Sequence, residues 1–88
     1  MSLRRWRRLH GPDIVAQVEP IEGLGMWEPS AWRAAAPADI SRTPVRVERL
    51  TDAHAAADAL ARDDFGHVCD AACGEWLPLE RRMESREM

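Results

Sequence analysis

Lysine is missing from this 88-residue sequence, and all twelve basic residues are arginine. Long hydrophobic runs are missing too, and no stretch approaches the roughly 20 apolar residues that a membrane-spanning helix requires. The arginine-rich start is not followed by the apolar region of a signal peptide. We therefore expect a cytoplasmic protein without a membrane partner, whose two cysteines are reduced thiols.

Motifs that mark common enzymes are also absent. The sequence contains no phosphate-binding P-loop, no G-x-G-x-x-G, no C-x-x-C and no serine in a nucleophile-elbow setting. The adjacent carboxylates of Asp63 and Asp64 are typical of a helix cap. His67 and Cys73 are six residues apart and not clearly on one helical face, which disfavours Cys-His catalysis. We predict a non-enzymatic protein with no cofactor and no small-molecule substrate.

Hydrophobic residues make up 45% of the chain, which is typical of a folded protein. Much of this fraction is alanine, which buries little area, so the four tryptophans must supply a large part of the core. The length allows one modest core. We predict a single domain over 1–88, with 1–2 and 84–88 frayed at the ends.

Alternating apolar residues predict strands, most clearly at Val45-Arg46-Val47-Glu48. Pro29 suits the first turn of a short helix that would run to Ala36, and Pro37 to Thr43 would then be a linker. The fold class that we expect is α+β, with a short antiparallel sheet of about three strands packed against two to three helices. The strands are predicted at 3–9, 14–19 and 44–49, and the main helices at 52–62 and 64–74.

The second main helix would carry one apolar stripe. In this interpretation the two cysteines are small core residues of that stripe. Its members are Phe65, Val68, Cys69, Ala72, Cys73 and Trp76.

Acidic charge is concentrated in the second half of the chain. Residues 1–50 contain eight arginines and six acidic residues, whereas residues 51–88 contain four arginines and nine acidic residues. Carboxylates can pair with guanidinium groups much as phosphates do, so an acidic helical face could occupy an arginine-lined groove. We predict a partner protein with a basic surface, a nucleic-acid-binding protein among the candidates, and leave the oligomeric state open, a homodimer included. The predicted contact residues are Asp58, Asp63, Asp64, Asp70, Trp27 and Trp32.

The small size, the acidic charge and the lack of a catalytic motif together resemble the small inhibitors that phages and mobile elements encode against host nucleases, anti-CRISPR proteins among them. This resemblance rests on size and charge over the whole chain and on no motif. It implies a blocking function and assigns no site residue.

Two alternatives remain open. His54, His67, Cys69 and Cys73 are ligand types that zinc prefers, but His67 and Cys69 would point to different sides of a helix, so we expect no metal in the first instance. The other alternative is a nucleic-acid-binding accessory protein, in which an N-terminal segment contacts phosphates. The residues of that segment are Arg4, Arg5, Arg7 and Arg8.

Overall fold

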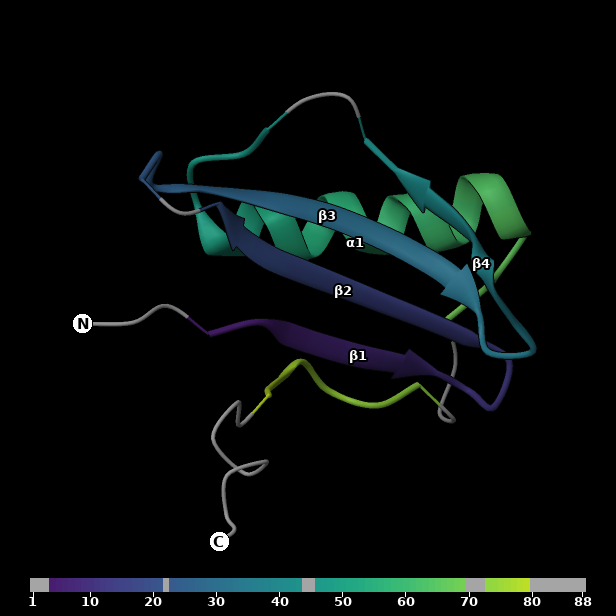
Figure 1. The fold of residues 1–88 in the computed structure, drawn as a ribbon. Coiled ribbons are helices and arrows are strands. Elements are labelled where there is room, and N and C mark those ends of the chain that lie inside the picture. Colours follow the sequence, from purple (N-terminus) through teal and green to yellow (C-terminus); the bar gives the residue numbers. More distant parts are fainter. Residues whose placement is uncertain (1–3, 22, 44–45, 70–72, 80–88) are drawn as a thin grey trace, which may run out of the picture.

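The chain folds into two layers, a sheet and a helix that covers one face of it (Figure 1). The computed structural model describes residues 4–21, 23–43, 46–69 and 73–79. All strand pairs are antiparallel, and the strand order is β4-β3-β2-β1-β5. The elements are β1 (Trp6–His10), β2 (Ile14–Ile21), β3 (Met26–Arg33), β4 (Ala36–Arg42), α1 (Leu50–Phe65) and β5 (Leu77–Pro78).

The core lies between α1 and the central strands β2 and β3. Alternation along β2 turns Ala16 and Val18 towards the helix, where both are fully buried. The helix presents Ala53, Ala57 and Ala61, all without exposed surface. Because alanine side chains are short, the helix axis can approach the sheet closely, and one large side chain of the sheet, that of Trp27, fills much of the remaining space.

The helix ends where glycine allows it to end. Gly66 has φ +69°, in the left-handed region, and its N–H donates to the carbonyl of Arg62 while that of His67 donates to the carbonyl of Ala61. The chain therefore leaves the helix at Gly66, and the prediction of a second helix over 64–74 is wrong. Among the described residues, one helix is present instead of the two or three that we expected.

The sheet is larger than predicted, because the expected helix at 29–36 is wrong. Residues 29–33 belong to β3, residues 34 and 35 form a turn, and Ala36 begins β4. Pro29 lies opposite Val18 in the β2–β3 register. The N–H and carbonyl of Trp27 both bond to Val47, away from β2, and strand alternation turns the nitrogen of Pro29 to the same side. A proline there removes no hydrogen bond between β2 and β3. The expected linker at 37–43 is mostly β4, so the described sheet has five strands and not three.

The remaining strand predictions differ in extent. Those at 3–9 and 14–19 correspond to β1 and β2, whereas the one at 44–49 reduces, among the described residues, to a single bridge between Val47 and Trp27. The predicted apolar stripe is wrong as a continuous buried face, because Val68 is 78% exposed and Cys69 is exposed. Phe65 and Trp76 do pack against the core, and Ala72 lies outside the described residues. The termini predicted to fray, 1–2 and 84–88, lie outside the described residues. In the part of the chain that is described, no helix is long and apolar enough to cross a membrane.

Candidate metal centre

Two histidines and two cysteines converge at the C-terminal end of β1. Each offers one ligand atom, and these four atoms all lie within 4.8 Å of one another. Nε2 of His67 is 3.1 Å from Sγ of Cys73, and Nδ1 of His10 is 3.3 Å from Sγ of Cys69. The residues of this cluster, which we call the clasp, are His10, His67, Cys69 and Cys73.

The local backbone explains why these residues meet. Because the helix stops at Gly66, His67 and Cys69 lie on a segment that is neither helix nor strand. The helical rule that would separate residues two apart therefore does not hold for them. Cys73 is brought to the same place by an isolated antiparallel bridge with His10, next to a hydrogen bond from the N–H of Gly74 to the carbonyl of Leu9.

The donor set of the clasp suits zinc. Two thiolates and two imidazoles form the tetrahedral S₂N₂ set that structural zinc sites use. Zinc–ligand bonds of about 2.0–2.3 Å place tetrahedral ligand atoms roughly 3.3–3.8 Å apart. Two of the distances in the clasp, 3.1 and 3.3 Å, are close to this range, and the others lie below 4.8 Å. Small adjustments would bring all four atoms to zinc-binding distance.

The Asp58 carboxylate orients the His10 ring through the ring nitrogen that faces away from the clasp. Nε2 of His10 is 2.8 Å from Oδ1 of Asp58, which leaves Nδ1 turned towards the clasp. Oδ2 of the same carboxylate accepts a hydrogen bond from Nη1 of Arg8 at 2.9 Å, and Nε of Arg8 donates to the carbonyl of Gly74. Metal-binding histidines usually make such a bond through the other ring nitrogen, which fixes the tautomer and the ring orientation.

The pKa directions agree with this arrangement. Burial lowers the pKa of His10 despite the opposing effect of Asp58, and this favours the neutral imidazole that binds metals. In the metal-free protein, burial and the neighbouring Cys73 raise the pKa of the Cys69 thiol. A zinc ion would have to displace that proton, so its affinity should increase with pH.

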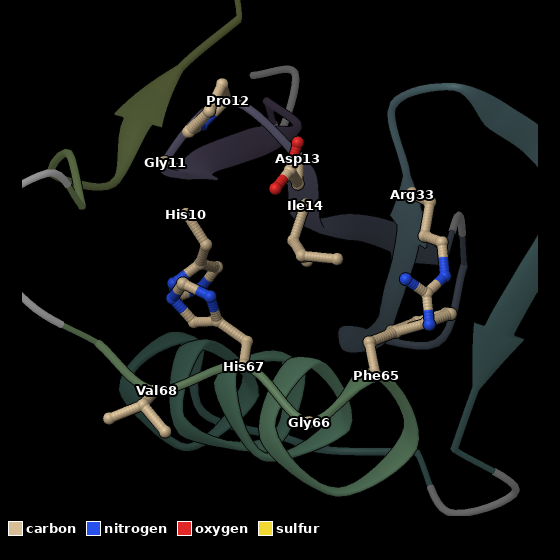
Figure 2. Close-up of a pocket in the computed structure, with 10 residues that line it drawn as sticks. All are labelled: His10, Gly11, Pro12, Asp13, Ile14, Arg33, Phe65, Gly66, His67 and Val68. Atoms are coloured by element: carbon tan, nitrogen blue, oxygen red, sulfur yellow. The ribbon is translucent and has the colours of Figure 1, made fainter.

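A cavity beside the clasp provides a route for an ion. Its volume is about 390 Å³, and it opens between the turn that follows β1 and the end of α1 (Figure 2). The rings of His10 and His67 lie together on one side, with their centroids 4.6 Å apart. On the other side, the guanidinium of Arg33 lies over the ring of Phe65, 5.1 Å from its centroid. The cavity is lined by His10, Gly11, Pro12, Asp13, Ile14, Arg33, Phe65, Gly66, His67 and Val68.

His54 is not part of the clasp, contrary to the zinc alternative drawn from the sequence. Its ring stacks on that of Trp76 at 4.2 Å between centroids, and the Trp6 ring makes a tilted contact with it at 5.6 Å. Burial lowers the pKa of His54, and its buried Nε2 has no hydrogen-bond partner among the residues that the structure describes. The fourth candidate ligand is instead His10, which was not predicted from the sequence.

The residues predicted to bind a partner protein are scattered. Trp27 is a core residue, 9% exposed, and Asp58 is bonded to His10 and Arg8. Asp63 and Asp64 are exposed at the end of α1, where they bond to Arg62 and Ser41. The ring of Trp32 is half-buried under the guanidinium of Arg7, and Asp70 lies outside the described residues. Partner binding through these residues stays a prediction.

The arginines of the nucleic-acid alternative belong to β1 and the residues before it. Arg7 donates through Nε and Nη2 to Oε1 of Gln17, and Arg8 is bonded to Asp58. Arg5 is 3.6 Å from Glu19, and Arg4 is exposed. Because successive residues of a strand point to opposite faces, Arg7 and Arg8 lie on opposite faces of the sheet. Nucleic-acid binding through this segment also stays a prediction.

Comparisons of the chain with protein-family models, curated proteins and solved structures found no match.

Proposed function

We propose that this chain is a small zinc-binding module in which the metal has a structural role. The convergence of four donor atoms within 4.8 Å, from His10, His67, Cys69 and Cys73, carries this proposal. Four protein ligands complete a tetrahedral coordination shell, whereas catalytic zinc sites keep one position for water or substrate. The proposed site therefore holds the fold together and catalyses no reaction. A reducing cytoplasm would keep both thiols available to the ion.

The metal would fasten the C-terminal segment to the edge of the sheet. Residues 73–79 run along β1, but β5 has only two residues and pairs only with Trp6 and Arg7. The segment also forms the isolated bridge between Cys73 and His10, and the N–H groups of Gly74 and Leu79 donate to the carbonyls of Leu9 and Arg5. Such short pairing is marginal in water. A metal bound by His10 and Cys73 would connect β1 to the 73–79 segment at the point where their pairing begins.

Metal analysis of the purified full-length chain tests the proposal. We expect about one equivalent of zinc after expression in zinc-supplemented medium. Removal by a chelator should loosen the 73–79 segment, which amide hydrogen exchange would detect as lost protection at Gly74 and Leu79. A folded protein that binds no stoichiometric zinc would rule out the proposed function.

The bond between Asp58 and His10 leads to a second prediction. Asp58→Asn should weaken zinc binding by about 10- to 100-fold, because the neutral amide holds the imidazole less firmly and lowers its basicity. Competition with a chromogenic chelator measures the change. Asp64→Asn is the matched control, since this carboxylate is on the same helix but contacts Ser41 and not the clasp. Equal affinities in the two variants would show that Asp58 does not support the site.

A further inference from the structure

The two sulfur atoms of the clasp are close to each other and differ in exposure. Both belong to the set of atoms that lie within 4.8 Å of one another. Cys69 is exposed and Cys73 is half-buried, whereas His10 is only 1% exposed. Of the four clasp residues, Cys69 is therefore the one most accessible to a solute.

The backbone around the sulfurs allows them to come together. A disulfide requires the sulfurs to approach to about 2.05 Å. Cys69 belongs to no helix or strand, and Cys73 is held by a single isolated bridge. Three residues separate them in the sequence. Closing the remaining distance breaks no strand ladder of the described sheet.

We propose that the clasp is a redox-sensitive zinc site, in which a hydroperoxide converts the Cys69 and Cys73 thiolates to a disulfide and zinc is released. This inference rests on the proposed zinc binding, because the metal is what would hold both sulfurs as thiolates. A thiolate, and not a thiol, is the form that attacks peroxide.

The atoms and electrons of the step balance. The Cys69 thiolate attacks one peroxide oxygen, so that an S–O bond forms, the O–O bond breaks and hydroxide leaves. The Cys73 thiolate then attacks the sulfenic sulfur, so that the S–S bond forms and a second hydroxide leaves. Two protons convert the hydroxides to water. The sulfurs lose two electrons in total, the peroxide gains them, and Zn²⁺ departs without a change in its charge.

Zinc leaves because a disulfide is a poor ligand. His10 and His67 remain, and two imidazoles form only half of a tetrahedral shell. The 73–79 segment would then be held by its few hydrogen bonds to β1 and by the packing of Trp76 on His54. Oxidation would in this way loosen the edge of the sheet and uncover Trp76.

Treatment of the zinc-loaded full chain with hydrogen peroxide tests the inference. A chromogenic chelator should report complete loss of the bound zinc. Intact mass should fall by two hydrogen atoms, and peptide mapping should find the Cys69–Cys73 bond. A thiol reductant and added zinc should restore one bound equivalent. Retained zinc, a disulfide between two molecules, or oxidation to sulfinate without a disulfide would overturn the inference.

A ligand exchange supplies the control. Cys69→His exchanges one zinc donor for another and removes one of the two thiols, so the zinc that this variant binds before treatment should stay bound in peroxide. Equal zinc loss from Cys69→His and the unchanged chain would also overturn the inference. If the variant does not bind zinc, peptide mapping of the Cys69–Cys73 disulfide in the unchanged chain still tests the inference. A chain that binds no zinc before oxidation refutes the proposed function, whereas a zinc-loaded chain that resists peroxide refutes only the redox response.

Discussion

Replacing His10 by alanine should abolish stoichiometric zinc binding, whereas replacing His54 by phenylalanine should leave one equivalent bound. His10 directs Nδ1 into the clasp, 3.3 Å from Sγ of Cys69. Loss of a direct ligand leaves three donors and should cost more affinity than the about 10- to 100-fold expected for an outer-shell residue. Titration of the metal-free chain with zinc in the presence of a competing chelator measures both variants.

Phenylalanine at position 54 preserves a planar aromatic ring and removes its nitrogen donors. The His54 ring stacks on Trp76 with an interplanar angle of 2°, and within the described part of the chain its Nε2 makes no hydrogen bond. Phenylalanine keeps the stacked ring and removes the unpaired buried nitrogen, so the fold should survive. If His54→Phe lost its zinc and His10→Ala kept it, the ligand set would be the one suggested by the sequence and the described clasp would be wrong.

The sequence supplied three members of the clasp because they are near one another in the chain. His67, Cys69 and Cys73 lie within seven residues, and their ligand types suggest a metal. His10 could not be found in this way, because it lies 59 positions before Cys69 in the sequence. Only the folded chain, through the bridge between His10 and Cys73, brings it to the other three residues. His54 is nearer in the sequence, but its ring stacks on Trp76 and makes a tilted contact with Trp6.

A strand was harder to predict where its residues are also typical of a helix. β1 and β2 were found because apolar residues alternate along Ile14–Val18. β3 was missed because Pro29 is typical of a first helical turn. The strand tolerates this proline because it pairs with Val18 at a position where its backbone nitrogen points away from β2. The helix boundary at Gly66 was missed for a related reason, since the apolar spacing beyond it continues a helical pattern that the left-handed glycine interrupts.

The two tryptophans predicted to bind a partner differ in their surroundings. Trp27 is 9% exposed and packs in the cluster that contains Ala16, Val18, Ala53 and Ala57. The ring of Trp32 lies on the opposite face of the sheet, as their odd spacing along β3 requires, and contacts Arg7. The structural cost of removing each ring should therefore be very different.

Trp27→Ala should destabilise the fold by about 3–5 kcal/mol, because it leaves a cavity between the helix and the sheet. A chain of this length has a total stability of roughly 4–13 kcal/mol, so a large share would be lost. Trp32→Ala, the matched control, should cost about 1 kcal/mol, as its ring is half-buried on the uncovered face. Urea unfolding followed by far-UV circular dichroism, with zinc at saturation for both variants, gives the two free energies. A cost at Trp32 equal to that at Trp27 would mean that the uncovered face is packed as firmly as the core, and the two-layer description would then fail.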